Sequence, residues 1–482
     1  MTATVAPGSP AGASPILTGP MGRGVLRFGA PMALAMAAHA SFNLIDLVII
    51  GSLPNGTAAL GALAVADMLA MLATIVVLGL SNATVAVIAR RLGRGDRDGA
   101  NAAAWGSVGV ILAMSIILGF AGVLGADWVT TELVGTKGDI RLVAIDYLEI
   151  IVGGSGSIFF LLQLTAIMRG YGESRFPSII IGGASVLNIV LDVIMAYGPG
   201  PAPAALQWAT PFAAWLGVPH MGVNGAAWAT VIARTLGSLV ALGWMLSRHS
   251  GLQFRLGLLR APREEVWRLV KIAAPSSAQL VVRILAVIVF VSLVARFFTT
   301  DADGTALAAF GICIRLDTIA LFSSLGWGAA ASTYVGQNLG AGQLDRALRA
   351  GWIAAAYTFL GMLAIATLYM GLAEPIVAFF DATPAVVAIG REYLMIVGPS
   401  YAFLGVAAVL SSALSGAGAT LSSFILDLIV VFGIQVPVGI VLIGQGFVGR
   451  PGAWWILALA NVASALIYAF WYSRRAWLHK QV

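Results

Sequence analysis

Charged side chains are scarce in this sequence. They make up 10% of its 482 residues, whereas hydrophobic residues make up 59%. A soluble protein of this length needs far more charge to cover its surface, so the composition excludes an ordinary water-soluble fold. Cysteine is almost missing as well. Because Cys313 is the single cysteine, no disulfide can form within the chain.

The motifs that accompany cofactor chemistry are also missing. The sequence has no GxxxxGKS phosphate loop, and its four histidines form no zinc-spaced cluster with cysteine. The glycine-rich text GRGDRDG at 93–99 is typical of a turn that joins two helices, not of a dinucleotide site. We therefore expect no enzyme and no cofactor. Any pumping would use an ion gradient, of protons or of sodium ions.

What the chain has in abundance is apolar runs long enough to cross a bilayer core. We count twelve, which predicts an all-α integral membrane protein. They lie at about 25–52, 60–90, 100–125, 140–167, 176–197, 222–246, 266–297, 305–335, 348–371, 390–414, 420–444 and 453–474.

Lys and Arg are distributed unevenly among the segments between these runs. If the N-terminus is cytoplasmic, most basic residues lie on the cytoplasmic side, and the exceptions outside are Lys137, Arg141, Arg296, Arg391 and Arg450. We therefore expect a multi-pass protein of the cell (inner) membrane with both termini cytoplasmic. The formal charge of +6 is explained by basic loops beside an anionic lipid leaflet, without nucleic acid as a partner.

A short text occurs twice in the chain, at 86–105 and at 333–352. With an offset of 247, Gly93 matches Gly340 and Trp105 matches Trp352. Six runs in each half is an even number, so both halves enter the membrane from the same side. The sequence thus predicts two parallel six-helix repeats that flank a central cleft.

The expected division of the chain follows from this duplication. We expect a disordered cytoplasmic tail at 1–24, an N-lobe at 25–246, a cytoplasmic linker at 247–265, a C-lobe at 266–474 and a second tail at 475–482. Pro31 and Pro275 are expected near helix starts, where a missing N–H costs least. The external loop at 197–221 contains Trp208 and Trp215, which favours a segment that lies in the membrane interface or, alternatively, covers the outer cleft.

Two acids lie deep in predicted spans, where a charge is costly. Asp46 lies in the first span, and Asp192 lies in the fifth, four residues after Asn188 and therefore on the same helix face. Two carboxylates and an amide would make a site for a proton or a sodium ion. The alternative is that each acid only forms a hydrogen bond with a neighbouring helix.

Other polar groups inside the spans have several possible roles. His39 could relay protons, contact substrate or pack as a hydrogen-bonding residue. Arg283 could repel cations, attract anions or pair with an acid, and Asp317 in the eighth span is at a suitable depth for that pair. Met36 and Phe42 could line a cleft for substrates together with His39 and Arg283.

Three segments of the sequence resemble the multidrug and toxic compound extrusion (MATE) family of antiporters. They are MRGYGESRFP at 168–177, GVNGAAWATVIAR at 222–234 and VGQNLGAGQLDRA at 335–347. The resemblance implies two six-helix lobes around a V-shaped cleft. It also implies the export of organic, often cationic and amphipathic compounds in exchange for protons or sodium ions. We expect the protein to act as a monomer in the lipid bilayer.

The resemblance also implies a cation site in the N-lobe. An acid in the first helix and an Asn-x-x-x-Asp pair in the fifth match Asp46, Asn188 and Asp192, and a threonine of the sixth helix matches Thr230. Another branch of the family has an acid at the position of Arg283. The chain therefore resembles the N-lobe-carboxylate branch, and Asp427 in the eleventh span matches no position of either site.

One alternative function remains open at this point. Flippases of lipid-linked precursors belong to a related superfamily, and they usually have a more basic central cavity. Arg283 agrees with such a cavity, whereas Asp46, Asn188 and Asp192 favour the cation-coupled exporter.

Overall fold

The computed structural model describes residues 15–53, 56–133, 138–247, 256–259, 262–300 and 303–479. Within these residues, twelve helical segments are long and apolar enough to cross a membrane, which confirms the predicted all-α membrane fold. Residues 1–14 of the expected first tail, 248–255 and 260–261 of the expected linker, and 480–482 of the second tail lie outside the described residues.

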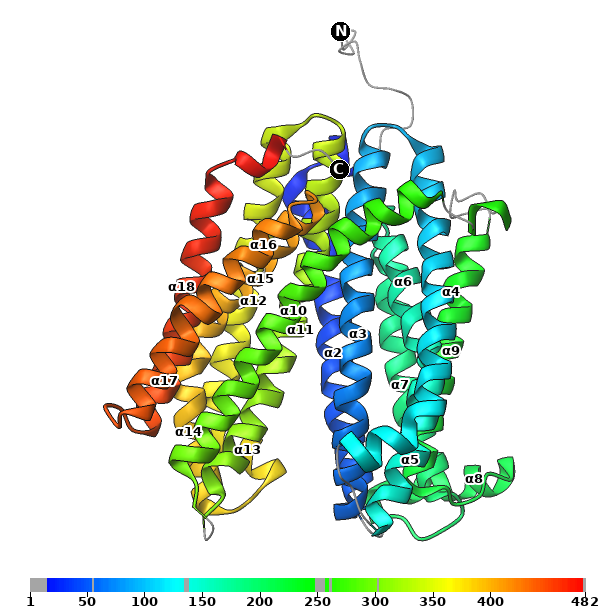
Figure 1. Cartoon of the computed structure of the whole chain (residues 1–482), viewed down its shortest axis with the longest axis vertical. Coiled ribbons are helices and arrows are strands. Elements are labelled where there is room, and N and C mark those ends of the chain that lie inside the picture. The colour runs from blue at the N-terminus through cyan, green and yellow to red at the C-terminus, as the bar shows by residue number, and fades with distance from the viewer. Residues whose placement is uncertain are drawn as a thin grey trace, which may run out of the picture.

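The first six spans form one bundle (Figure 1). Short helix α1 (Pro15–Thr18) is followed by α2 (Met21–Gly51), α3 (Gly56–Gly93), α4 (Arg97–Trp128) with η1 (Val129–Leu133), α5 (Gly138–Gly153), α6 (Gly156–Gly170), α7 (Arg175–Tyr197), η2 (Ala204–Ala209), α8 (Thr210–Leu216) and α9 (Gly222–Leu246). Helices α5 and α6 together make the fourth span.

The second six spans form the other bundle, after the short turn η3 (Leu256–Leu259). They are built from α10 (Arg263–Phe298), α11 (Thr305–Gly340), α12 (Leu344–Gly371), α13 (Ala373–Phe380), α14 (Pro384–Val397), η4 (Gly398–Ser400), α15 (Tyr401–Gly416), α16 (Thr420–Leu428), η5 (Ile429–Gln435), α17 (Val436–Gly444) and α18 (Arg450–Ser473), before η6 (Ala476–His479). The tenth span is α14, η4 and α15, so it is broken near its middle, as the fourth span is.

The first helix of each half begins against the other half. Val25 and Phe28 of α2 belong to a core cluster that is otherwise built mainly from α11, α12, α15 and α18. Conversely, Leu269 and Ile272 of α10 pack with α3, α4 and α6. The beginning of each lobe's first helix therefore packs into the core of the other lobe, and these two contacts join the lobes.

The prolines of these two helices are not where we expected them. Pro31 lies inside α2 and Pro275 lies inside α10, so the expectation that both are near helix starts is wrong. A proline inside a helix removes one backbone hydrogen bond and kinks the helix, and both prolines lie where a helix passes from one bundle to the other. The tail expected at 1–24 is also wrong in part, since α1 and the start of α2 are helical.

The two bundles touch at the end of the molecule where α2 begins and α18 ends, which we call the near end. There Arg90 Nη1 donates to the Ala417 carbonyl at 3.0 Å, and Gln337 Nε2 donates to the Gly170 carbonyl at 3.1 Å. Arg90 and Gln337 occupy the same place in the two repeats, so these contacts are reciprocal. At the opposite, far end the ribbons of the two bundles diverge (Figure 1).

Candidate functional site

The residues expected to form the N-lobe site meet between α2, α7 and α9. Asn188 and Asp192 are one turn apart on α7, and Asn188 Nδ2 donates to both carboxylate oxygens of Asp192 at 3.0 Å. The same amide nitrogen lies 3.2 Å from Thr230 Oγ1 on α9 and donates to it. Asp192 is fully buried. The structure thus brings Thr230 into contact with Asn188, and its role in ion binding stays a prediction.

Asp46 of α2 completes this group. Its carboxyl group interacts electrostatically with that of Asp192. Two neighbouring carboxylates repel each other when both are ionised, so the pair favours one proton shared between them. Two acids that share a proton form a coupled pair whose charge changes by one when the proton leaves or enters. The site can therefore exchange a proton, and its carboxylate and hydroxyl oxygens are also the type of ligand that a hard cation such as sodium prefers.

A second contact between α2 and α7 lies two helical turns from the first. His39 Nδ1 is 2.9 Å from Ser185 Oγ. Ser185 Oγ also lies 2.9 Å from the Ile181 carbonyl oxygen of its own helix. The His39 ring also lies 6.2 Å, centroid to centroid, from Phe322 of α11. His39 therefore lies where the N-lobe meets the C-lobe.

The other two residues of the expected substrate cleft on α2 are half-buried. Met36 packs against the core cluster that α2 shares with the C-lobe, and Phe42 is partly exposed one turn before Asp46. Their roles in substrate binding stay predictions.

Sequence reasoning missed one cation beside the acidic pair. Arg234 follows Thr230 by one turn of α9, so it shares a helix face with the site, and it interacts electrostatically with both Asp192 and His39. One guanidinium balances the single negative charge that the protonated acid pair carries. The four-residue spacing from Thr230 is the signal in the sequence that could have identified Arg234.

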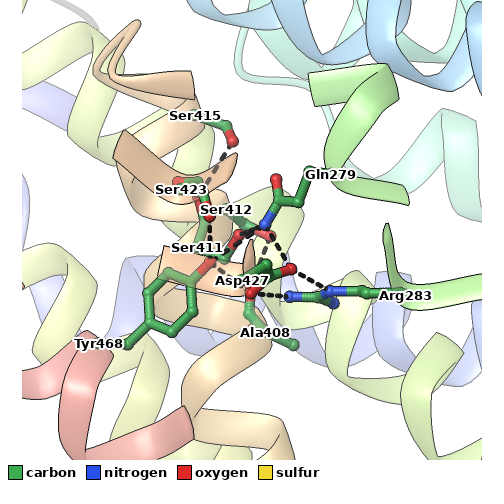
Figure 2. Close-up of polar contacts among 9 residues, drawn as sticks. All are labelled: Gln279, Arg283, Ala408, Ser411, Ser412, Ser415, Ser423, Asp427 and Tyr468. Carbon is green, nitrogen blue, oxygen red and sulfur yellow. Dashed lines mark hydrogen bonds and ion pairs between the residues drawn. The ribbon is translucent and has the colours of Figure 1, made fainter. Parts of the chain in front are cut away.

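Arg283 of α10 pairs with Asp427 of α16, across 144 residues of sequence (Figure 2). Arg283 Nε lies 2.5 Å from Asp427 Oδ2, and Nη2 lies 3.4 Å from Oδ1. Of the three roles considered for Arg283, pairing with an acid is the one observed. The acid is not Asp317, so the expected pair between the seventh and eighth spans is wrong.

Asp427 is held by more than its ion pair. Tyr468 of α18 donates its hydroxyl hydrogen to Oδ1 at 2.7 Å, and Gln279 Nε2 donates to Oδ2 at 3.0 Å (Figure 2). Gln279 Nε2 also lies 2.8 Å from Ser411 Oγ of α15. This network ties four helices of the C-lobe together. A carboxylate with one cation and two neutral donors is well compensated, which favours a structural role for the pair.

Comparisons with known proteins agree with this architecture. A family model described as MatE matches residues 31–194 and 281–441, well over half of the chain. The "Probable multidrug resistance protein NorM" of Thermotoga maritima is 26% identical over 383 residues, which cover 79% of this chain and 77% of that protein. The "FAD transporter" of Shewanella oneidensis is 22% identical over 415 residues, 86% of each chain.

Solved structures share the fold over nearly the whole length. An "outward-facing conformation of a multidrug resistance MATE family transporter of the MOP superfamily" matches with a TM-score of 0.85 and 23% identity, and the match covers 97% of this chain and 98% of that one. A MOP superfamily transporter from Pyrococcus furiosus matches with the same TM-score, identity and coverage. At this level of identity the likeness concerns the fold.

Proposed function

The chain belongs to the MatE family of membrane transporters, which are not enzymes, and we propose that it exports amphipathic, often cationic organic compounds in exchange for protons or sodium ions. The observation that carries this proposal is the group of Asp46, Asp192, Asn188 and Thr230 inside the N-lobe, in which Asp192 is fully buried. A protonatable pair inside a membrane lobe is what an ion-coupled exporter needs. The flippase alternative is not favoured, because most of the relatives carry multidrug-resistance names.

We further propose that the near end faces the cytoplasm. The basic residues Arg90, Arg94 and Arg97 belong to this end, beside the anionic leaflet. The contacts between the lobes at this end would then close the protein toward the cytoplasm. Export then proceeds by rocking of the two lobes about the central axis.

The acid pair couples this movement to the ion in our proposal. An incoming proton or sodium ion neutralises the charge of the pair and changes which packing of α2 against α7 is favoured. Substrate leaves when the ion binds, and loss of the ion on the other side resets the site. A ligand can shift an equilibrium only through different affinities for its two states, so the ion must bind the two packings differently.

Efflux from vesicles tests the role of Asp46. Everted vesicles that contain the protein are given a proton gradient or a sodium gradient separately, and drug accumulation is measured. Asp46→Asn should insert normally but lose gradient-driven transport. The control is Asp127→Asn, which removes an acid paired with Arg141 at 2.8 Å on the surface. Full transport by Asp46→Asn would reject the assignment.

Equilibrium binding separates the two ions. If sodium is the coupling ion, one stoichiometric sodium site should be present in the purified protein and absent from the Asp46→Asn, Asp192→Asn double variant. If the proton is the coupling ion, neither protein should bind sodium, and transport should respond to the proton gradient alone. Sodium binding that persists in the double variant would place the site elsewhere.

A further inference from the structure

Asp317 of α11 is an acid that the N-lobe site does not use. It lies inside a membrane span, twelve residues after the start of α11, and it is only partly exposed. Within the described part of the chain, none of the ion pairs involves Asp317. Asp427, by contrast, forms an ion pair with Arg283. An intramembrane acid without a counter-cation needs another reason to be there.

Two tyrosine hydroxyls converge on this carboxylate from the tenth span. Tyr393 of α14 donates to Asp317 Oδ2 at 2.6 Å, and Tyr401, the first residue of α15, donates to Oδ1. Between these tyrosines lies η4, where the tenth span is broken. Asp317 thus holds both sides of a helix break from a neighbouring helix, an arrangement that we call the tyrosine clasp.

The tyrosines cannot easily turn away. Both are almost fully buried. Tyr393 packs against Trp454 of α18 with ring centroids 5.0 Å apart, and Tyr401 packs against Tyr369 of α12 at 6.1 Å. The clasp therefore responds to a change of charge at Asp317 through its hydrogen bonds and not through free rotation of the rings.

The other titratable groups around Asp317 are few. Cys313 lies one turn earlier on α11, and Tyr369 faces Tyr401 from α12. Glu392 of α14 pairs with Arg450 of α18. Trp454 Nε1 donates to Glu392 at 3.0 Å. Glu374 of α13 pairs with Arg391, and Arg283 of α10 is bound to Asp427.

We propose that Asp317 is a second proton-binding site, in the C-lobe, and that its protonation opens the tyrosine clasp across the break of the tenth span. The proton comes from water through the exposed side of Asp317. It converts one carboxylate oxygen from an acceptor into a hydroxyl donor. The neutral acid then has one strong acceptor left. Its new hydroxyl can donate to the oxygen of one tyrosine, but the hydrogen of that tyrosine then has no strong acceptor on the acid. One side of the break is therefore held less tightly.

Infrared difference spectroscopy of the protein in lipid measures this protonation directly, without transport. The C=O stretching band of protonated carboxyl groups is followed as the pH is lowered. Asp317→Asn, which keeps the size and one acceptor oxygen, should remove one component of this band. Asp381→Asn, which changes an acid in the loop between α13 and α14, serves as the control. The Asp317 component should persist in the Asp46→Asn, Asp192→Asn double variant. The test of Asp317 is therefore independent of the proposed ion site in the N-lobe.

The tyrosines give an independent test, should Asp317→Asn fold poorly. Tyr393→Phe and Tyr401→Phe each remove one donor from the anion, so the Asp317 component should appear at a pH about one to two units higher. Tyr357→Phe, which alters a tyrosine stacked on Trp327, is the control and should change nothing. Spectra that are identical for the wild type, Asp317→Asn and both tyrosine variants over the whole pH range would overturn the proposal.

Hydrogen exchange tests the release of the break. In the wild type, exchange at 398–403, corrected for the chemical rate, should become faster once the Asp317 component has appeared. Asp317→Asn should show that faster exchange at every pH. Protection at these amides that stays constant through the protonation would show that the clasp does not open.

Discussion

Gly93 and Gly340, which occupy the same place in the two repeats, face each other at the near end of the molecule. A Cβ on Gly93 would lie 2.9 Å from the Gly340 Cα and 2.1 Å from the Gln337 carbonyl oxygen, and one on Gly340 would lie 2.1 Å from the Arg90 carbonyl oxygen. No side chain fits in either place. The duplicated glycines therefore allow α3 and α11 to close the near end by backbone contact.

Gly93→Ala should shift the lobes toward the state that is open at the near end. The methyl group overlaps the backbone of the other lobe only when this end is closed, and such overpacking costs about 1–3 kcal/mol. Spin labels at Asp98 and Asp345, in a Cys313→Ala background, should report a larger share of long distances. Gly182→Ala is the matched control, because its added Cβ meets no atom within 4 Å. An unchanged distribution in Gly93→Ala would contradict this role of the glycines.

The far ends of α2 and α10 should move in the opposite sense. Labels at Gly51 and Thr300 lie on opposite lobes. The neighbouring Ser52 is left unchanged because its hydroxyl contacts that of Tyr197 at 2.5 Å. Their distance should change as pH or sodium is varied, since the ion acts on the acid pair of α2 and α7. Asp46→Asn should reduce the change. A constant distance in protein proven to transport would exclude the rocking mechanism.

Breaking the Arg283–Asp427 pair from one side should destabilise the C-lobe strongly. Arg283→Met leaves a buried carboxylate without its cation, at a cost of about 3–5 kcal/mol. Adding Asp427→Asn removes the charge and keeps one acceptor oxygen for either Tyr468 or Gln279, so the double variant should recover much of this loss. Denaturation midpoints of the wild type, Arg283→Met, Asp427→Asn and the double variant measure the coupling between the two residues. Equal stabilities of Arg283→Met and the wild type would mean that the pair contributes nothing.

The segment α8 should lie in the outer membrane interface. Ala209 and Ala213 are buried against Val193 and Tyr197, while Phe212 and Trp215 point outward and are 55% and 81% exposed. An apolar outer stripe of this kind is typical of a helix that lies in the interface. A spin label at position 215 should be more accessible to oxygen than to a water-soluble relaxant. A label at Gln207 is the exposed polar control, and equal accessibility at both positions would favour the lid instead.

Much of this protein follows from its sequence alone. The apolar runs predicted the spans because crossing a bilayer requires about 20 apolar residues in a row. The repeated text predicted the two halves, and the four-residue spacing of Asn188 and Asp192 placed both on one face of α7. Each of these inferences uses local periodicity, which is a property of neighbouring residues in the chain.

Tertiary structure alone decided which distant groups meet. The sequence predicts a similar depth in the membrane for Arg283 and Asp317. In the structure, however, Arg283 binds Asp427 and Asp317 binds two tyrosines. Depth along a span can be counted from the sequence, but the direction in which each helix presents its polar face depends on how all the helices pack. The same packing places the first turns of α2 and α10 against the opposite lobe at the near end. It also places Gly93 against Gly340.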